Sequence, residues 1–236
     1  MQKTVHRADS RGRAEHGWLH SRHTFSFAMY RNPERMQFGK LRVLNDDVVD
    51  PGAGFDTHPH DNMEIISVPL AGTLRHRDSM GNVHIIRAGE VQLMSAGTGI
   101  THSEYNDSQT EAVNFLQIWV LPKRRDTAPR YEQRAFDPAA RQNRLQLVVS
   151  PDGRDGSLVI NQDAWFSLTS VDAGQAVEYA VQHPGNAVYL FVISGEISCA
   201  TESLGERDAM GVSGADRLSL QGVRRAEVLL IEVPLD

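Results

Sequence analysis

Two short motifs in this chain place metal-binding side chains two residues apart. The first motif, HPH, contains His58 and His60, and the second, THSE, contains His102 and Glu104. Because successive side chains of a β-strand point to opposite faces, the two members of each pair would point the same way on a strand. Three neutral imidazole nitrogens and one carboxylate oxygen suit a divalent first-row ion such as Fe(II), Mn, Co, Ni, Cu or Zn. The two pairs therefore predict a single metal site.

The predicted ligand set leaves room for chemistry at the ion. If the ion is octahedral, four protein ligands leave two positions open for a substrate and for O2. A metal ion lowers the cost of deprotonating a hydroxyl group that binds to it. Glu104 is the candidate catalytic base, because its carboxylate would lie close enough to accept that proton.

The segments around these motifs are typical of short β-strands. Apolar or alternating runs are separated by Gly, Pro, Asn and Asp, and helical periodicity is scarce. The strands expected in the first half are 40–49, 63–70, 72–79, 83–90, 91–96 and 112–121. Those expected in the second half are 145–150, 157–160, 165–171, 176–182, 187–200 and 226–235. The pattern predicts an all-β protein, in which the motif SMGN at residues 79–82 forms a tight hairpin turn.

The two halves of the chain resemble each other, which suggests an internal duplication. An apolar strand ends at Gly72 in the first half and at Gly195 in the second, and another strand follows each glycine. Aligning these glycines leaves the second copy with Val181 and His183 in place of the HPH pair. One imidazole cannot hold a catalytic ion, so the second copy has lost its chelate and His183 is expected to be a solvated turn residue.

Length and repeat together predict two domains. The chain has 236 residues, 40% of them apolar, which is enough for two cores. We expect an N-terminal metal-binding domain over residues 1–130 and a C-terminal domain without metal ligands over residues 131–236. The charged segment 122–144, which interrupts the strand rhythm, is the expected linker.

Composition bounds the partners and the compartment. The formal net charge is −6, which argues against direct binding of nucleic acid. A single cysteine, Cys199, cannot form an internal disulfide and fits a reducing compartment. The first residues lack the apolar segment of a signal peptide, and no apolar run is long enough to span a membrane. We therefore expect a cytoplasmic protein with no membrane partner. The sequence does not indicate an oligomeric state, and a monomer is the default expectation.

The two motifs and their surroundings resemble the paired motifs of the cupin superfamily. The first stretch is GAGFDTHPHDNMEIISVPLAG, with one residue more than usual before its last glycine, and the second is GEVQLMSAGTGITHSEYN. In the second stretch Ser95 replaces the usual proline, and two extra residues precede His102. These departures, together with GWLHSRHTFSFAMY and QIWVLP, resemble the pirin family, especially the bacterial pirin-like quercetin 2,3-dioxygenases. The resemblance is specific from about residue 8 to residue 160 and looser beyond.

The resemblance implies a bicupin, built of two double-stranded β-helix (jelly-roll) barrels with a metal site only in the N-terminal one. Carried over residue by residue, it implies that His58, His60, His102 and Glu104 hold one divalent ion, with Fe(II) as the expected metal. Glu64 is a ligand in many other cupins but lies outside the ligand set of the pirin pattern. Strand parity alone leaves the place of Glu64 open.

The activity implied by the resemblance is the opening of a flavonol's central ring by O2, with release of carbon monoxide. The partners are then a small planar aromatic substrate and O2. Two other functions stay open. Eukaryotic pirins, which the chain also resembles, are linked to transcription cofactors, so an iron-binding, redox-sensing regulatory protein that acts through protein partners is one alternative. A metal-assisted hydrolase or isomerase of the broader cupin type is the other.

Three further histidines invite a functional interpretation. His20 and His23 precede an alternating run, and we expect them to be structural or surface residues. His76 shares a strand face with Leu74 and Asp78. A place for His76 behind the metal and a purely structural place both stay open.

Overall fold

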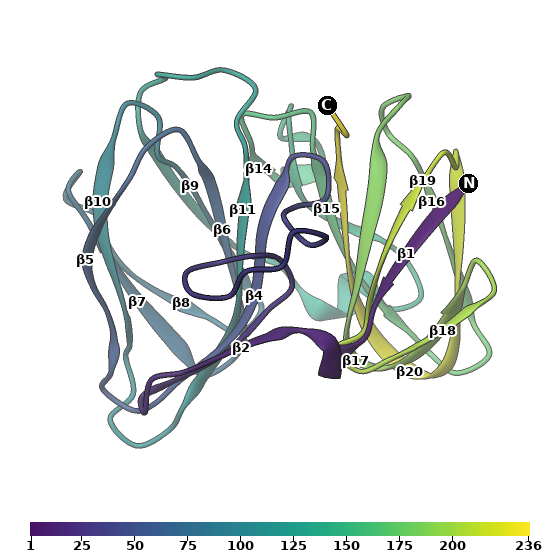
Figure 1. Ribbon diagram of the computed structural model, residues 1–236, viewed down its shortest axis with the longest axis horizontal. Coiled ribbons are helices and arrows are strands. Elements are labelled where there is room, and N and C mark those ends of the chain that lie inside the picture. Colours follow the sequence, from purple (N-terminus) through teal and green to yellow (C-terminus); the bar gives the residue numbers. More distant parts are fainter. The chain divides into compact units, whose positions relative to one another are not determined.

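Strands make up most of the chain (Figure 1), which the computed structural model describes over all residues from 1 to 236. The only helices are three short 3-10 turns, η1 (Ala8–Ser10), η2 (Pro138–Arg141) and η3 (Arg154–Gly156). None of them has the length or the apolar character that a membrane span requires. The predicted all-β fold class is confirmed.

The chain folds into two compact units. The N-terminal unit consists of Gly12–Gln37 and Leu41–Phe136, and the C-terminal unit consists of Met1–Arg11, Phe38–Lys40 and Asp137–Asp236. The first residues belong to the C-terminal unit, because β1 (Gln2–His6) pairs with β19 (Ala209–Ser213). The division into domains after residue 130 stays a prediction.

The N-terminal unit contains two antiparallel sheets. Its strands are β2 (Gly12–Glu15), β3 (Leu19–His23), β4 (Leu41–Val49), β5 (Gly54–His60), β6 (Glu64–Ala71), β7 (Thr73–Asp78), β8 (Val83–Arg87), β9 (Glu90–Ser95), β10 (Ile100–Asn106), β11 (Val113–Val120) and β12 (Arg130–Ala135). One sheet has four strands in the order β5-β10-β7-β8. The other has seven strands in the order β12-β9-β6-β11-β4-β3-β2. The segments that carry HPH and THSE are therefore hydrogen-bonded neighbours in the smaller sheet.

The inward faces of these sheets are apolar in two places and polar in a third. One apolar cluster contains Leu19, Val49, Leu74, Ile86, Val113 and Phe115, and another contains Ile65, Met94, Ala96 and Ile100. Strict alternation on β7 and β10 buries every second side chain, which includes His76, His102 and Glu104. Buried polar side chains are normally hydrogen-bonded or bind an ion, so this polar part of the interior requires an explanation.

The first half confirms most of the strand predictions and corrects one segment. The SMGN hairpin forms as expected, since β7 pairs with β8 and Gly81 adopts a positive φ of 92°. The segment 122–144, expected as a linker, instead contains β12, which extends the larger sheet by pairing with β9. Its sequence RYEQRA is polar throughout because β12 is an edge strand with mostly half-buried side chains, and hydrophobic periodicity therefore does not reveal it.

The C-terminal unit is a nine-stranded sheet that includes the N-terminal strand. Its other strands are β13 (Gln146–Ser150), β14 (Leu158–Val159), β15 (Trp165–Val171), β16 (Ala176–Ala180), β17 (Ala187–Cys199), β18 (Glu202–Gly205), β19 (Ala209–Ser213) and β20 (Arg217–Val233). The sequence predicted β20 only in its second half, as a strand over residues 226–235. β17 bends at Gly195, whose φ is 80° and where a Cβ would collide with the Arg225 carbonyl. This glycine lets one long strand pair with β19 at one end and β18 at the other.

Candidate metal centre

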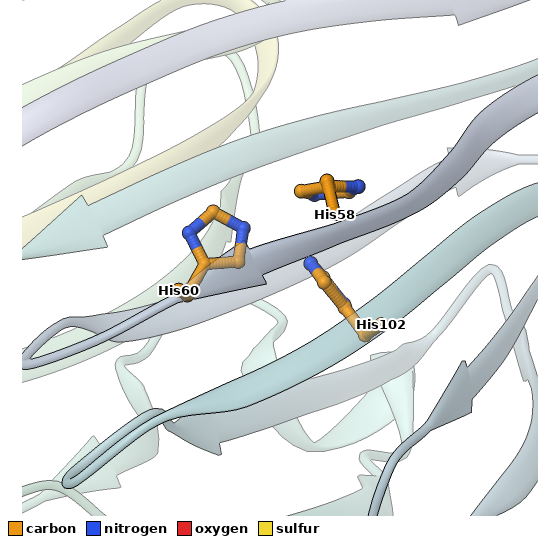
Figure 2. A group of neighbouring side chains, drawn as sticks. All are labelled: His58, His60 and His102. Atoms are coloured by element: carbon orange, nitrogen blue, oxygen red, sulfur yellow. The ribbon is translucent and has the colours of Figure 1, made fainter.

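The three motif histidines come together on two neighbouring strands. β5 supplies His58 and His60, β10 supplies His102, and His58 is the direct cross-strand partner of His102. One ring nitrogen from each residue lies within 4.8 Å of one from each of the others. Figure 2 shows the rings pointing toward one another across the pair of strands. The ring centroids are 4.5 Å apart for His58 and His102, and 4.9 Å apart for the other two pairs.

Glu104 lies beside this group on β10. Its carboxylate belongs to a second set of close donor atoms with His102 and His76. The side chain is buried, and it accepts hydrogen bonds from Ser67 Oγ at 3.2 Å and from Gln117 Nε2 at 2.6 Å. Burial raises the pKa of Glu104 above its ordinary value. The structure therefore brings the four sequence-predicted site residues into one region, with His102 common to both sets.

A β-bulge in β5 sets the direction of the side chains. Between the paired positions His102 and Glu104, the partner strand advances from His58 to Phe55, so β5 carries one extra residue. Strict alternation would put Phe55 on the face opposite His58, yet both line the same pocket. The bulge thus lets an aromatic ring and two imidazoles face the same space, an arrangement that strand parity alone does not predict.

Two of the three imidazoles, those of His60 and His102, are in the protonation state that metal binding requires. Burial, and then the proximity of the other imidazoles, lowers the pKa of His60 to about 3 and that of His102 to about 3. Both rings are therefore neutral near pH 7 and carry a free lone pair. The Nδ1 of His58 lies 2.7 Å from the carbonyl oxygen of Asp56, which can only accept, so Nδ1 carries the proton and Nε2 is the free donor atom.

One buried atom tests whether an ion fits. Nε2 of His102 is buried and has no hydrogen-bond partner in the protein. A buried polar atom without a partner costs about 1–3 kcal/mol, and a cation at this position would supply the missing interaction. Three imidazoles next to a carboxylate match the donors that a divalent transition metal prefers. The residues present therefore fit a single divalent ion.

A pocket opens beside the four candidate ligands. It has about 350 Å³ of empty space, part of which is open solvent at its mouth, and is lined by Phe27, Asn45, Asp47, Phe55, His58, His60, Glu104, Gln117 and Trp119. Asn45 Oδ1 is buried without a partner. Burial raises the pKa of Asp47 to about 7, while a hydrogen bond from Ser21 opposes the shift. Three aromatic rings and these two polar side chains suit a planar ligand that carries hydroxyl or carbonyl groups.

The sequence analysis did not identify Asn45, Asp47 or Gln117 as site residues. A signal for the first two is present in β4, where Asn45, Asp46 and Asp47 interrupt the otherwise mostly apolar run LRVLNDDVV. All three are buried. Consecutive polar residues in the middle of a buried strand are unusual enough to suggest a function. Gln117 stands alone between apolar neighbours on β11, and nothing in the sequence distinguishes it.

The remaining residues that the sequence singled out lie elsewhere. Glu64 is buried, accepts a hydrogen bond from Ser95 Oγ at 2.7 Å and belongs to neither set of close donor atoms. His20 is exposed beside Glu15, whereas His23 is buried with its ring edge against Phe27. His183 is exposed in the turn that precedes β17. No set of close metal-binding donor atoms includes a residue of the C-terminal unit.

Comparison with known proteins gives consistent results over the whole chain. The family model described as Pirin matches residues 4–120, and the one described as Quercetinase C-terminal cupin domain matches residues 147–233. A protein of Escherichia coli K12 named quercetin 2,3-dioxygenase is 45% identical over 234 residues, covering 98% of both chains. A pirin-like protein of Caulobacter vibrioides is 36% identical over 225 residues, which cover 95% of this chain and 96% of that protein.

Solved structures agree with this result. The crystal structure of YhhW from Escherichia coli superposes with a TM-score of 0.95 at 43% identity and covers 99% of this chain and 98% of that one. A second structure, described as bacterial pirin YhhW in complex with nickel(II), superposes with a TM-score of 0.94 at 42% identity and covers 99% of both chains. The two barrels of the bicupin expected from the sequence are thus confirmed as the fold.

Proposed function

The chain belongs to the pirin family, and from this premise we propose that it is a metal-dependent dioxygenase of the quercetinase type. In this proposal it opens the central ring of a flavonol such as quercetin with O2 and releases carbon monoxide. The observation that carries the proposal is the group of three histidines and one glutamate beside a pocket lined with aromatic rings. The name of the 45% identical relative supports the same reaction class.

We propose His58, His60, His102 and Glu104 as the ligands of one divalent ion, with Fe(II) as the native metal. When bound, such an ion acts as a Lewis acid that lowers the pKa of a coordinated hydroxyl group. The nickel complex of a 42% identical relative supports a divalent ion but leaves the native metal open, because sites of this type accept several ions according to their availability.

Glu104 is the proposed base for the proton of the flavonol hydroxyl. Its burial raises the pKa, which makes the carboxylate a better proton acceptor than an exposed one. Hydrogen bonds from Ser67 and Gln117 hold the two carboxylate oxygens in place. The proton would move to a carboxylate oxygen that already faces the pocket, so no side chain has to travel during the step.

The other pocket residues would bind and orient the substrate. Phe27, Phe55 and Trp119 present ring surfaces that exclude water and pack against a planar aromatic molecule. Asn45 and Asp47 stand two residues apart on β4 and face the same pocket, where the unpartnered Asn45 Oδ1 can accept a hydrogen bond from a substrate hydroxyl. These contacts would hold the substrate hydroxyl next to Glu104.

The test is reconstitution without O2, one metal at a time, followed by addition of quercetin and O2 with detection of carbon monoxide. We expect carbon monoxide in an amount equal to the quercetin consumed with at least one metal. If metal binds but no ion supports release of carbon monoxide, the dioxygenase proposal is wrong. The iron-binding, redox-sensing regulatory function would then become the leading alternative.

A further inference from the structure

Three buried side chains form a line that starts at the candidate ligand His102 and continues through His76 to Asp78. β10 pairs with β7 so that His102 is opposite Asp78 and Glu104 is opposite His76. Nε2 of His76 lies 3.1 Å from Oδ2 of Asp78, and Nδ1 of His76 lies 3.5 Å from Nδ1 of His102. The exposed fractions of Asp78, His76 and His102 are 9%, 0% and 1%. The carboxylate of Glu104 also lies within 4.8 Å of a nitrogen of each ring, but it accepts its hydrogen bonds from Ser67 and Gln117. The hydrogen-bond partners of the two rings along the line are therefore each other and the carboxylate of Asp78.

The carboxylate at the end of the line is fixed in orientation. Oδ1 of Asp78 accepts hydrogen bonds from the backbone N–H groups of Met80 and Asn82, both at 3.0 Å. Oδ2 accepts from Asn82 Nδ2 at 2.8 Å and faces His76. Because a carboxylate only accepts, Nε2 of His76 must carry a proton and donate it.

The position of this proton determines the state of His102. A metal bound through Nε2 of His102 requires a bare Nε2 and therefore a proton on Nδ1, which faces Nδ1 of His76. Two N–H groups cannot face each other in a hydrogen bond, so Nδ1 of His76 must be the acceptor. Both constraints are met by one arrangement, in which His102 donates to His76 and His76 donates to Asp78.

We propose that Asp78 and His76 are positioning residues that fix the tautomer and orientation of His102, so that its Nε2 is presented bare to the metal. This inference rests on the metal site of the proposed function but not on its substrate or reaction. Two of the candidate histidine ligands then differ in what orients their rings. His58 is oriented by a backbone carbonyl that no substitution removes, whereas His102 is oriented by side chains. Partners of this kind typically change metal affinity by about 10- to 100-fold.

Asp78→Asn is a sharp test, because the surrounding donors dictate how the new amide must lie. The oxygen of the amide has to accept from the backbone N–H groups of Met80 and Asn82, which cannot turn, and this places its NH2 group against Nε2 of His76. The side-chain amide of Asn82, which donates to this position in the unaltered protein, can turn so that its oxygen accepts from the new NH2 group. The direction of both hydrogen bonds along the line then reverses, and the proton of His102 moves to Nε2. We expect the affinity for Ni(II), measured by calorimetry, to fall about 10- to 100-fold.

Asp61→Asn is the matched control. It makes the same chemical change next to His60 and removes the same charge, but Asp61 has no contact with the line of Asp78, His76 and His102. We expect the Ni(II) affinity of this variant to change by less than about threefold, compared with the 10- to 100-fold loss expected for Asp78→Asn. An equal loss in both variants would mean that charge, and not proton direction, governs the affinity, and would overturn the proposal.

A spectroscopic measurement gives a second readout that general loss of stability cannot imitate. In the zinc-loaded protein, two-bond proton–nitrogen correlation spectra should show His76 neutral and protonated at Nε2. A proton on Nδ1 of His76, or a doubly protonated ring, would contradict the proposed arrangement. If the unaltered protein binds no divalent ion, neither nickel nor zinc nor any other, then both the metal site and the proposed function are wrong. If it binds them and Asp78→Asn binds equally well, only the positioning role fails.

Discussion

The two units have the same kind of fold but surround a buried glutamate in different ways. In the C-terminal unit the only buried carboxylate is that of Glu232, which accepts hydrogen bonds from Tyr179 Oη, from the backbone N–H groups of Gln182 and His183, and from Asn186 Nδ2. In the N-terminal unit the carboxylate of Glu104 has two donors, and its other neighbours are imidazoles and an open pocket. A buried carboxylate enclosed by four hydrogen-bond donors serves the structure, whereas one that also faces imidazoles and a pocket can take part in binding a ligand.

The cores of the two units show the same contrast. The C-terminal cluster is continuous and apolar, with Leu190, Val192, Leu218, Leu220, Val228 and Leu230 among its fully or almost fully buried members. Two apolar clusters of the N-terminal unit are smaller, and His76, His102 and Glu104 are buried outside both. Polar side chains therefore occupy part of the interior of the N-terminal unit, which is typical of functional sites.

The largest expected effect separates the histidines of the two units. His58→Ala or His102→Ala removes one of the clustered imidazoles, and we expect at least about a 100-fold loss of affinity for a divalent ion. The fold should persist, because the apolar clusters do not involve these residues. Metal content by mass spectrometry and unfolding by circular dichroism measure the two effects.

His183→Ala is the matched control for these variants, since it removes an exposed histidine of the C-terminal unit. It should keep its metal in full. Metal loss in this variant, or full metal retention in His102→Ala, would mean that the N-terminal cluster is not the binding site.

The next largest effect concerns two buried glutamates, of which Glu104 belongs to the predicted ligand set and Glu64 does not. Glu104→Gln keeps an oxygen near the ion but cannot accept the substrate proton, so we expect kcat per bound metal to fall about 10²- to 10⁴-fold. Glu64→Gln should keep its rate per bound metal, because Glu64 lies outside both sets of close donor atoms. Steady-state kinetics with metal content measured on the same sample decides. A larger loss in Glu64→Gln would reverse the roles given to the two residues.

A third prediction concerns the stability of the C-terminal unit and not metal binding. Glu232→Gln places an NH2 group among four hydrogen-bond donors and leaves at least one of them unpaired in a buried place. We expect a loss of about 1–3 kcal/mol in the free energy of unfolding, with unchanged metal content. Urea denaturation followed by fluorescence measures the loss. Metal release without a shift of the urea midpoint would contradict the scaffold role of this residue.

The smallest expected effect lies in the pocket. Asn45→Leu has nearly the same size and removes a hydrogen-bonding group that is proposed to contact the substrate. One lost hydrogen bond is worth about 0.5–1.5 kcal/mol, so we expect KM for quercetin to rise up to about tenfold while kcat changes little. The same substitution at Asn114, which lies on β11 outside the pocket lining, is the control. An unchanged KM in Asn45→Leu would remove this residue from the substrate site.

Much of the fold follows from local pattern. β4, β6, β7, β8, β9 and β11 were all expected from apolar or alternating runs and from the turn residues between them. Such runs are visible because these strands bury side chains on one face, as β7 does, or on both, as β6 and β9 do. β12 was missed because an edge strand with half-buried polar residues shows no such alternation. β1 was not expected as a strand, and its pairing could not be predicted, since its partner β19 lies some two hundred residues further along the chain. Pairing over such a distance leaves no signal in the local sequence.

The candidate site, like the fold, could be predicted from the sequence only in part. Residue type and spacing alone determined which side chains offer metal-binding atoms, since HPH and THSE on strands must each present two ligands to one face. Only the tertiary structure decided that these faces meet, that the bulge in β5 adds Phe55 to the same pocket, and that Asn45 and Asp47 of β4 lie opposite. It also decided which buried atoms stay without a partner, such as Nε2 of His102. Hydrogen-bond satisfaction depends on all neighbours at once, and those neighbours come from strands that are distant in the sequence.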